Sequence, residues 1–125
     1  MQRNMDLVRK ILLKLESSPN GWAPEDFGIQ SFSPQEIGYH VHIMMQEGLI
    51  EGTEVTNSGS CGPESMPRNL TWKGHEFLDL ARDQSRWNRA KSTIEKVGGA
   101  PISVWMKVLN DLLLQSVDVV SAKMS

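Results

Sequence analysis

The spacing of apolar residues predicts a chain of helices interrupted by one β-hairpin. Near the N-terminus, apolar residues recur every three or four positions at Met5, Val8, Ile11, Leu12 and Leu15. This spacing predicts an amphipathic helix over residues 4–16, with Asn4 as its N-cap. The opposite, polar face carries Arg9, Lys10 and Lys14. The run from Ser17 to Gly21 contains proline, asparagine and glycine and is expected to end the helix.

A second helix is predicted from Ser33 to about Glu47. Ser33 is followed by Pro34 and, three residues on, by Glu36, which is the pattern of a capping box with proline in the first turn. Gly48 is expected to end the helix. One face is apolar and consists of Ile37, Val41, Met44 and Met45. The other face is a possible partner-contact surface and consists of Gln35, Tyr39, His42, Ile43 and Gln46.

Three segments have the composition of strands. Residues 22–32 are ambiguous, because Pro24–Asp26 could start a helical turn. Phe27–Phe32 alternates aromatic or β-branched residues with small or polar ones, which favours a short strand. Leu49–Thr56 predicts a longer strand, and Arg68–Thr71 a return strand. The intervening residues 57–67 contain two glycines and two prolines and are expected to form the loop of a hairpin.

The C-terminal third is predicted to be helical. Thr71 is expected to cap a helix whose inward side chains are Phe77, Leu78 and Ala81. Residues 82–96 either continue this helix or form another, with Trp87, Ala90 and Ile94 as apolar positions. Gly98 and Gly99 end that segment, and a final amphipathic helix is expected from Pro101 to about Val120. Its apolar side consists of Val104, Trp105, Val108, Leu109, Leu112 and Leu113.

This order of elements predicts an α+β, winged-helix-like domain: helix, short strand, helix, β-hairpin wing and C-terminal helices. We expect one domain over residues 1–125, with a helical extension over about 72–122, because the length fits a single hydrophobic core. In a winged helix, the helix before the hairpin is the one usually placed in the DNA major groove.

Several short motifs resemble an uncharacterised domain-of-unknown-function family that is common in bacteria and their prophages. They are residues 4–16, Ile37–Val41, Glu47–Gly52, Leu70–Asp79, Ala81–Asp83, Trp87–Asn88 and Gly98–Gly99. The stretch Leu70–Gly74 is also similar to the strand-to-helix junction of winged-helix regulators. The resemblance implies a winged-helix fold with a strand in place of the first helix of the helix-turn-helix, and a bacterial or phage origin. It supplies no catalytic residues.

Candidate chemistry is sparse, and we expect no enzyme, cofactor or metal site. His40 and His42 point about 200° apart on a helix, so they cannot chelate one ion together, and we expect two surface or boundary histidines. Cys61, the single cysteine, has no base nearby in sequence to activate it. With one cysteine and no long apolar run, the chain is expected to be cytoplasmic and not membrane-bound.

Charge distribution argues against the function most common for this fold. From residue 15 to residue 67 there is no lysine or arginine, whereas eight acidic residues occur: Glu16, Glu25, Asp26, Glu36, Glu47, Glu51, Glu54 and Glu64. DNA binding depends on cations that neutralise phosphates, and this stretch contains the would-be recognition helix. A protein-interaction module is therefore the primary hypothesis, with a DNA-binding regulator as the alternative.

The sequence leaves two possible interactions undecided. Arg82, Arg86 and Arg89 are spaced to share a helical face and are either a solvated surface or a nucleic-acid patch. The last helix carries more apolar residues than one face requires, so it either packs wholly on its own domain or forms a homodimer.

The four tryptophans, Trp22, Trp72, Trp87 and Trp105, are expected in the core or at interfaces.

Overall fold

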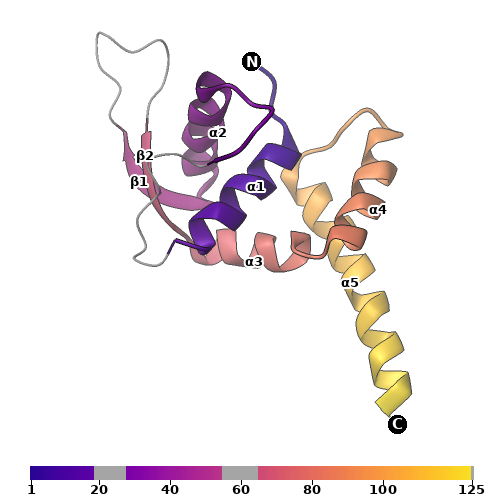
Figure 1. Ribbon diagram of the computed structural model, residues 1–125. Coiled ribbons are helices and arrows are strands. Elements are labelled where there is room, and N and C mark those ends of the chain that lie inside the picture. The colour runs from indigo at the N-terminus through magenta and orange to yellow at the C-terminus, as the bar shows by residue number, and fades with distance from the viewer. Residues whose placement is uncertain (19–27, 55–64, 125) are drawn as a thin grey trace. The chain divides into compact units, whose positions relative to one another are not determined.

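A computed structural model describes residues 1–18, 28–54 and 65–124, and these residues form an α+β structure (Figure 1). The elements in chain order are α1 (Met5–Glu16), α2 (Pro34–Glu47), β1 (Ile50–Glu54), β2 (Ser65–Leu70), α3 (Trp72–Ala81), α4 (Gln84–Glu95) and α5 (Ile102–Met124). The chain divides into two compact units, Met1–Leu78 and Asp79–Ser125, so the boundary falls inside α3.

The ends of α1 and α2 confirm the predicted caps. The Asn4 side chain accepts hydrogen bonds from the backbone N–H groups of Asp6 and Leu7. At the start of α2, the Ser33 hydroxyl accepts from Glu36 N at 3.1 Å, and the Glu36 carboxylate accepts from Ser33 N at 3.1 Å. Gly48 ends α2 in the left-handed region, with φ 81°. These contacts satisfy backbone groups that a helix end otherwise leaves without a partner.

The hairpin pairs β1 with β2 in antiparallel fashion and contains a bulge. Ile50 faces Leu70 and Glu51 faces Asn69, but Gly52 faces Pro67, so Arg68 is the extra residue on β2. The bulge places Pro67, which has no N–H to donate, within the strand. The return strand therefore begins at Ser65, three residues before the predicted start. The expected strand end at residues 55–56 and most of the expected loop lie outside the described residues.

The predicted strand over Phe27–Phe32 is wrong for the residues that are described. Gln30 and Ser31 form a turn, Phe32 lies in a bend, and residues 28–29 have no regular structure; Phe27 lies outside the described residues. Gly28 has φ 62° and Ser31 has φ 77°. Both values lie in the left-handed region, which is incompatible with an extended strand.

The N-terminal unit buries a core drawn from all of its elements. α1 and α2 pack against the hairpin and against each other (Figure 1). Core side chains are Leu7, Val8, Ile11, Leu12, Leu15, Val41, Met44, Leu49, Ile50, Leu70, Phe77 and Leu78. Arg9, predicted on the polar face of α1, is also buried, whereas Lys10 and Lys14 are exposed as expected.

The C-terminal unit is a pair of neighbouring helices held by two stacked indoles. The alternative of one continuous helix after Thr71 is excluded, because α3 ends at Ala81 and α4 begins at Gln84 with Asp83 as its N-cap. Trp87 of α4 and Trp105 of α5 stack with ring centroids 4.7 Å apart. Ala90, Ile94 and Leu109 complete the buried contact.

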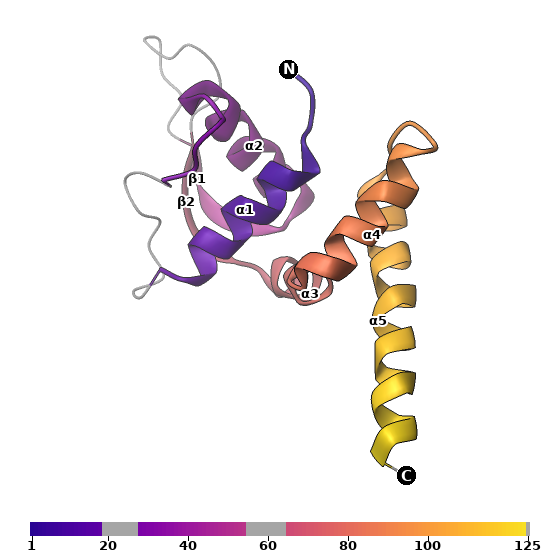
Figure 2. The same ribbon diagram turned by 45° about the vertical axis from the view of Figure 1, so that its right-hand side comes forward.

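The two helices of this pair differ in length. α4 has 12 residues and α5 has 23, so α5 continues well beyond α4 (Figure 2). The predicted apolar side of α5 is buried only at Trp105 and Leu109. Val104, which was expected on the same side, is exposed.

Candidate interaction surface

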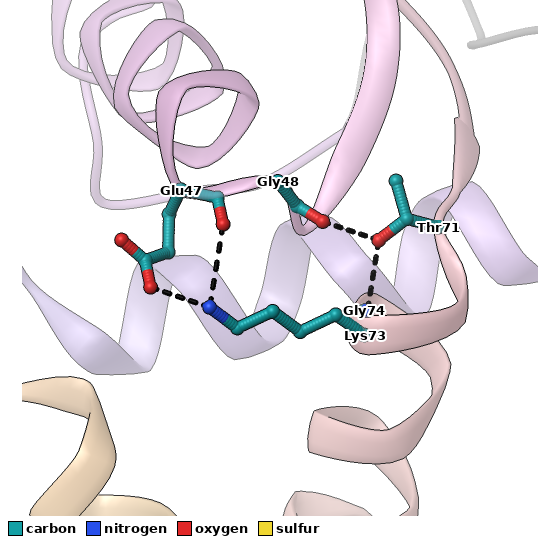
Figure 3. A network of polar contacts seen from close by, with 5 residues as sticks. All are labelled: Glu47, Gly48, Thr71, Lys73 and Gly74. Atoms are coloured by element: carbon teal, nitrogen blue, oxygen red, sulfur yellow. Dashed lines mark hydrogen bonds and ion pairs between the residues drawn. The ribbon is translucent and has the colours of Figure 1, made fainter.

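The Leu70–Gly74 motif forms a structural junction where the end of α2 meets the start of α3 (Figure 3). The Thr71 hydroxyl donates to the carbonyl of Gly48 and accepts from Gly74 N at 3.0 Å. Thr71 N donates to the carbonyl of Leu49 at 3.0 Å. Thr71 therefore caps α3, as predicted, and also holds it to the residues that follow α2.

Gly74 is required by the same junction. A Cβ atom at this position would lie 1.9 Å from the Leu49 carbonyl oxygen and 3.4 Å from the Leu70 Cβ. Any larger side chain would therefore separate α3 from the start of β1. Close packing therefore explains Leu70 and Gly74 in this motif, and helix capping explains Thr71.

Trp72 is the member of the motif that the junction does not bury. Its side chain is 83% exposed, although it belongs to the first turn of α3. At about 100° per residue, Trp72 lies on the opposite side of the helix from Phe77, Leu78 and Ala81. The sequence pattern could have revealed this exposure, since the inward positions of α3 were predicted. A large indole held in water on a fixed helix has the properties of a contact residue in a protein interface.

The outer face of α2 is accessible, as its predicted role requires. Gln35 and Gln46 are exposed, and Tyr39, His42 and Ile43 are partly exposed. These five positions follow one another at helical spacing, and a hydrogen bond of 3.3 Å joins Gln46 Nε2 to His42 Nε2. The structure thus gathers the five residues on one side of α2, while their contact with a partner stays a prediction.

His40 has a structural role that the sequence did not reveal. It is buried, with 1% of its surface exposed, so the expectation of a surface or boundary histidine is wrong for this residue. Its Nε2 accepts a hydrogen bond of 2.8 Å from Asn4 N, and its Nδ1 lies 2.7 Å from the Glu36 carbonyl oxygen. Because Nδ1 then donates and Nε2 accepts, the ring is neutral and ties the start of α1 to α2.

Acidic side chains predominate over the second half of the N-terminal unit. Between Pro34 and Leu78 the sequence has six acidic residues and two cationic ones, Arg68 and Lys73. Lys73 Nζ lies 2.5 Å from the Glu47 carboxylate and 3.4 Å from the Glu47 carbonyl oxygen (Figure 3). Arg68 donates to the Thr53 hydroxyl at 3.3 Å. Both cations thus make contacts within the unit, and α2 itself contains no lysine or arginine.

Two of the three cations of α1 lie beside a different segment. Lys10 and Lys14 border a shallow hollow together with residues 28–31, and Lys10 Nζ stands 5.5 Å from the centroid of the Phe32 ring. They are therefore placed next to the turn that precedes α2.

The three arginines of the predicted nucleic-acid patch have separate surroundings. Arg82 precedes α4 and lies 3.4 Å from the Asp79 carboxylate. Arg86 donates to the backbone carbonyls of Leu80, at 2.8 Å, and Asp79, at 3.1 Å, near the end of α3. Of the three arginines, only Arg89 is both part of α4 and exposed. The helical spacing argument therefore does not apply to Arg82, and Arg86 satisfies carbonyl groups that would otherwise lack donors.

The described part of the chain has no group of three or more His, Cys, Asp or Glu side chains that could hold a metal ion. Cys61 lies outside the described residues. None of the helices in the described ranges has the length and apolar character that crossing a bilayer requires.

A family profile described as "Hypothetical protein (DUF2513)" matches residues 2–100. The chain belongs to the DUF2513 family. This confirms the predicted membership of a domain-of-unknown-function family, while the winged-helix fold and the prophage origin stay predictions. The match covers α1 to α4 and stops before α5 begins at Ile102.

One relative is a protein of Haemophilus influenzae described as "Uncharacterized protein". It is 39% identical to this chain over 97 residues, which cover 76% of this chain and 80% of the relative. No solved structure matches the chain.

Proposed function

We propose that this member of the DUF2513 family is a non-catalytic protein-interaction module. In this proposal the N-terminal unit is a winged-helix-like scaffold, with α2 in the position of the recognition helix and the β1–β2 hairpin as the wing. Its partner is a cationic protein surface. The observation that carries the proposal is the 83% exposure of Trp72, in a unit where acidic residues outnumber cationic ones between Pro34 and Leu78.

The energetics of interfaces support this choice of anchor. Exposed tryptophans with a rigid backbone lose little conformational entropy on binding and bury a large area, so they are common hot spots. The backbone of Trp72 is held on both sides, by Thr71 and by Gly74. The acidic residues around the hairpin would then select a partner of opposite charge.

The alternative is a DNA-binding regulator, and one feature favours it. The exposed side of α4 carries polar groups that commonly contact phosphates and bases, namely Gln84, Ser85, Asn88, Arg89, Ser92 and Thr93. Arg89 is the only cation among these six residues. A single cation would neutralise too few phosphates for tight binding, which is why the interaction module is preferred.

We expect Trp72→Ala to weaken partner binding without destabilising the fold. Loss of a hot-spot tryptophan costs about 2 kcal/mol or more, which lowers affinity by roughly 30-fold. The measurement is quantitative mass spectrometry of proteins retained from nuclease-treated native extract by the immobilised wild-type chain and by the variant. Val97→Ala is the matched control, because Val97 is an exposed apolar residue outside the N-terminal unit.

The expected result is a set of basic proteins retained by the wild type and by Val97→Ala but depleted in Trp72→Ala. The same proteins should be released by added salt, because the contact is partly electrostatic. Identical profiles for all three proteins would contradict the proposal.

A further inference from the structure

We propose that the C-terminal half of α5 is a self-association site that pairs with the same segment of a second copy in antiparallel orientation. The site consists of Leu113, Val117, Val120 and Met124, which we call the α5 seam. This contact lies outside the N-terminal unit, so it neither requires nor replaces the partner site at Trp72.

The seam continues the stripe by which α5 packs against α4. Trp105 and Leu109 are buried at the α4 contact, and Leu113 follows four residues later on the same side. The remaining seam residues follow at intervals of four, three and four, which is the spacing of a coiled-coil contact. The stripe therefore does not end where α4 ends.

The seam is apolar, and most of it is exposed to solvent in the C-terminal unit. Val117 is 48% exposed, Val120 56% and Met124 83%, and the flanking Leu114 and Val119 are each more than half exposed. Burying the seam and these flanking side chains in two copies would remove on the order of 1,000 Å² from water, which is the size of a weak interface. The two seams with their flanking residues are therefore adequate for a modest dimer.

Charge favours a second copy over a charged partner. From Leu112 to Met124 the only charged residues are Asp118 and Lys123. Neither belongs to the seam, so a twofold pair brings no like charges together at its centre. A strongly acidic or basic partner would find nothing on the seam to recognise.

Helix length favours the antiparallel orientation. α4 has 12 residues against the 23 of α5, so about 11 residues of α5 extend past it. In the antiparallel orientation, the seam of the second copy covers this extension along its length and ends near the start of the first copy's α4. In the parallel orientation, the second α5 would instead run on beside α4.

The antiparallel register also makes every layer apolar. Leu113 faces Met124 of the second copy, and Val117 faces Val120 of the second copy. The twofold axis repeats both contacts, which gives four layers. In a parallel pair, the heptad spacing would continue to Asn110, and two amide side chains would have to meet in the layer next to Leu113.

Sedimentation equilibrium of the full chain tests the pairing. We expect a monomer–dimer equilibrium for the wild type at tens of micromolar, and a dissociation constant raised more than about tenfold in Val117→Asp, because each copy would bury a carboxylate. Val104→Asp is the matched control, since Val104 is an exposed valine of α5 on the side opposite the seam. A wild type that stays monomeric at about 200 µM would overturn the proposal, because a dimer with a dissociation constant of tens of micromolar would be largely associated at that concentration. Equal weakening by both variants would also overturn it.

Disulfide trapping tests the register in a Cys61→Ser background. We expect a mixture of the Leu113→Cys and Met124→Cys chains to form a mixed disulfide, and neither chain alone to crosslink with itself, because a disulfide needs Cα atoms within about 7 Å. Self-crosslinking of the Leu113→Cys chain alone would show a parallel pair and would overturn the antiparallel arrangement.

Discussion

Replacement of Gly74 by alanine is expected to unfold most of the N-terminal unit. The added Cβ would lie 1.9 Å from the Leu49 carbonyl oxygen, which also accepts the hydrogen bond from Thr71 N. Relief of this overlap requires α3 to move away from β1, and that movement breaks the contacts of the Thr71 hydroxyl with Gly48 and Gly74. Overpacking and the lost hydrogen bonds together cost about 3 kcal/mol or more.

This cost is large for a unit of its size. At about 0.05–0.15 kcal/mol per residue, a unit of this length has a free energy of unfolding of only several kcal/mol. Amide hydrogen exchange followed by mass spectrometry should show lost protection in α1, α2 and β1. Glu76→Ala, an exposed change in the same helix, is the control and is expected to alter stability by less than about 0.5 kcal/mol. Wild-type protection in Gly74→Ala would contradict the described junction.

Trp87→Ala is expected to separate α4 from α5. Trp87 is 1% exposed, and its ring stacks on Trp105 at 4.7 Å with an interplanar angle of 25°. Truncation of a buried tryptophan costs about 3–5 kcal/mol, because it removes the apolar contact and leaves a cavity. The C-terminal unit has few other large buried side chains, so this loss is comparable with its whole stability.

The same residue type supplies the control for this experiment. Trp72→Ala removes an indole that is already in water, so its effect on stability should be within about 0.5 kcal/mol. We expect urea denaturation monitored by circular dichroism to show an early transition for Trp87→Ala only, and hydrogen exchange to assign it to α4 and the first half of α5. Equal effects of the two substitutions would show that the indole stack does not hold the unit.

Local signals in the sequence predicted the helix ends well. Asn4, Ser33 with Glu36, Gly48 and Thr71 act within a few residues of their positions, and the structure confirms each of them. Such contacts depend on chain geometry over one turn, so spacing alone is enough to identify them.

Contacts between distant segments were not predictable in this way. His40 binds Asn4, 36 residues away, and its burial follows from how α1 lies against α2. Arg86 was assigned to a charged face, but its guanidinium reaches backward to the last carbonyls of α3. A residue-type pattern cannot tell an arginine that caps a helix from one that meets a ligand, because both lie at the same helical spacing.

Backbone conformation accounts for the error at residues 28–32. Aromatic and β-branched residues at Ile29 and Phe32 favoured a strand, whereas the left-handed Ser31 interrupts the extended chain. Serine rarely adopts this conformation, so its type gave no warning. In the hairpin, the bulge opposite Gly52 accommodates Pro67 within β2, and the strand begins at Ser65, earlier than the predicted start at Arg68.

The central claim is that the acidic N-terminal unit binds protein and not DNA. Fluorescence anisotropy of a labelled generic duplex, titrated with the full chain at about 50 mM and again at about 200 mM salt, tests it most directly, because phosphate-driven binding falls steeply over this range. The account predicts no saturable rise in anisotropy at either salt concentration. Tight binding at low salt that is lost at high salt would contradict it and would make the DNA-binding regulator the primary function.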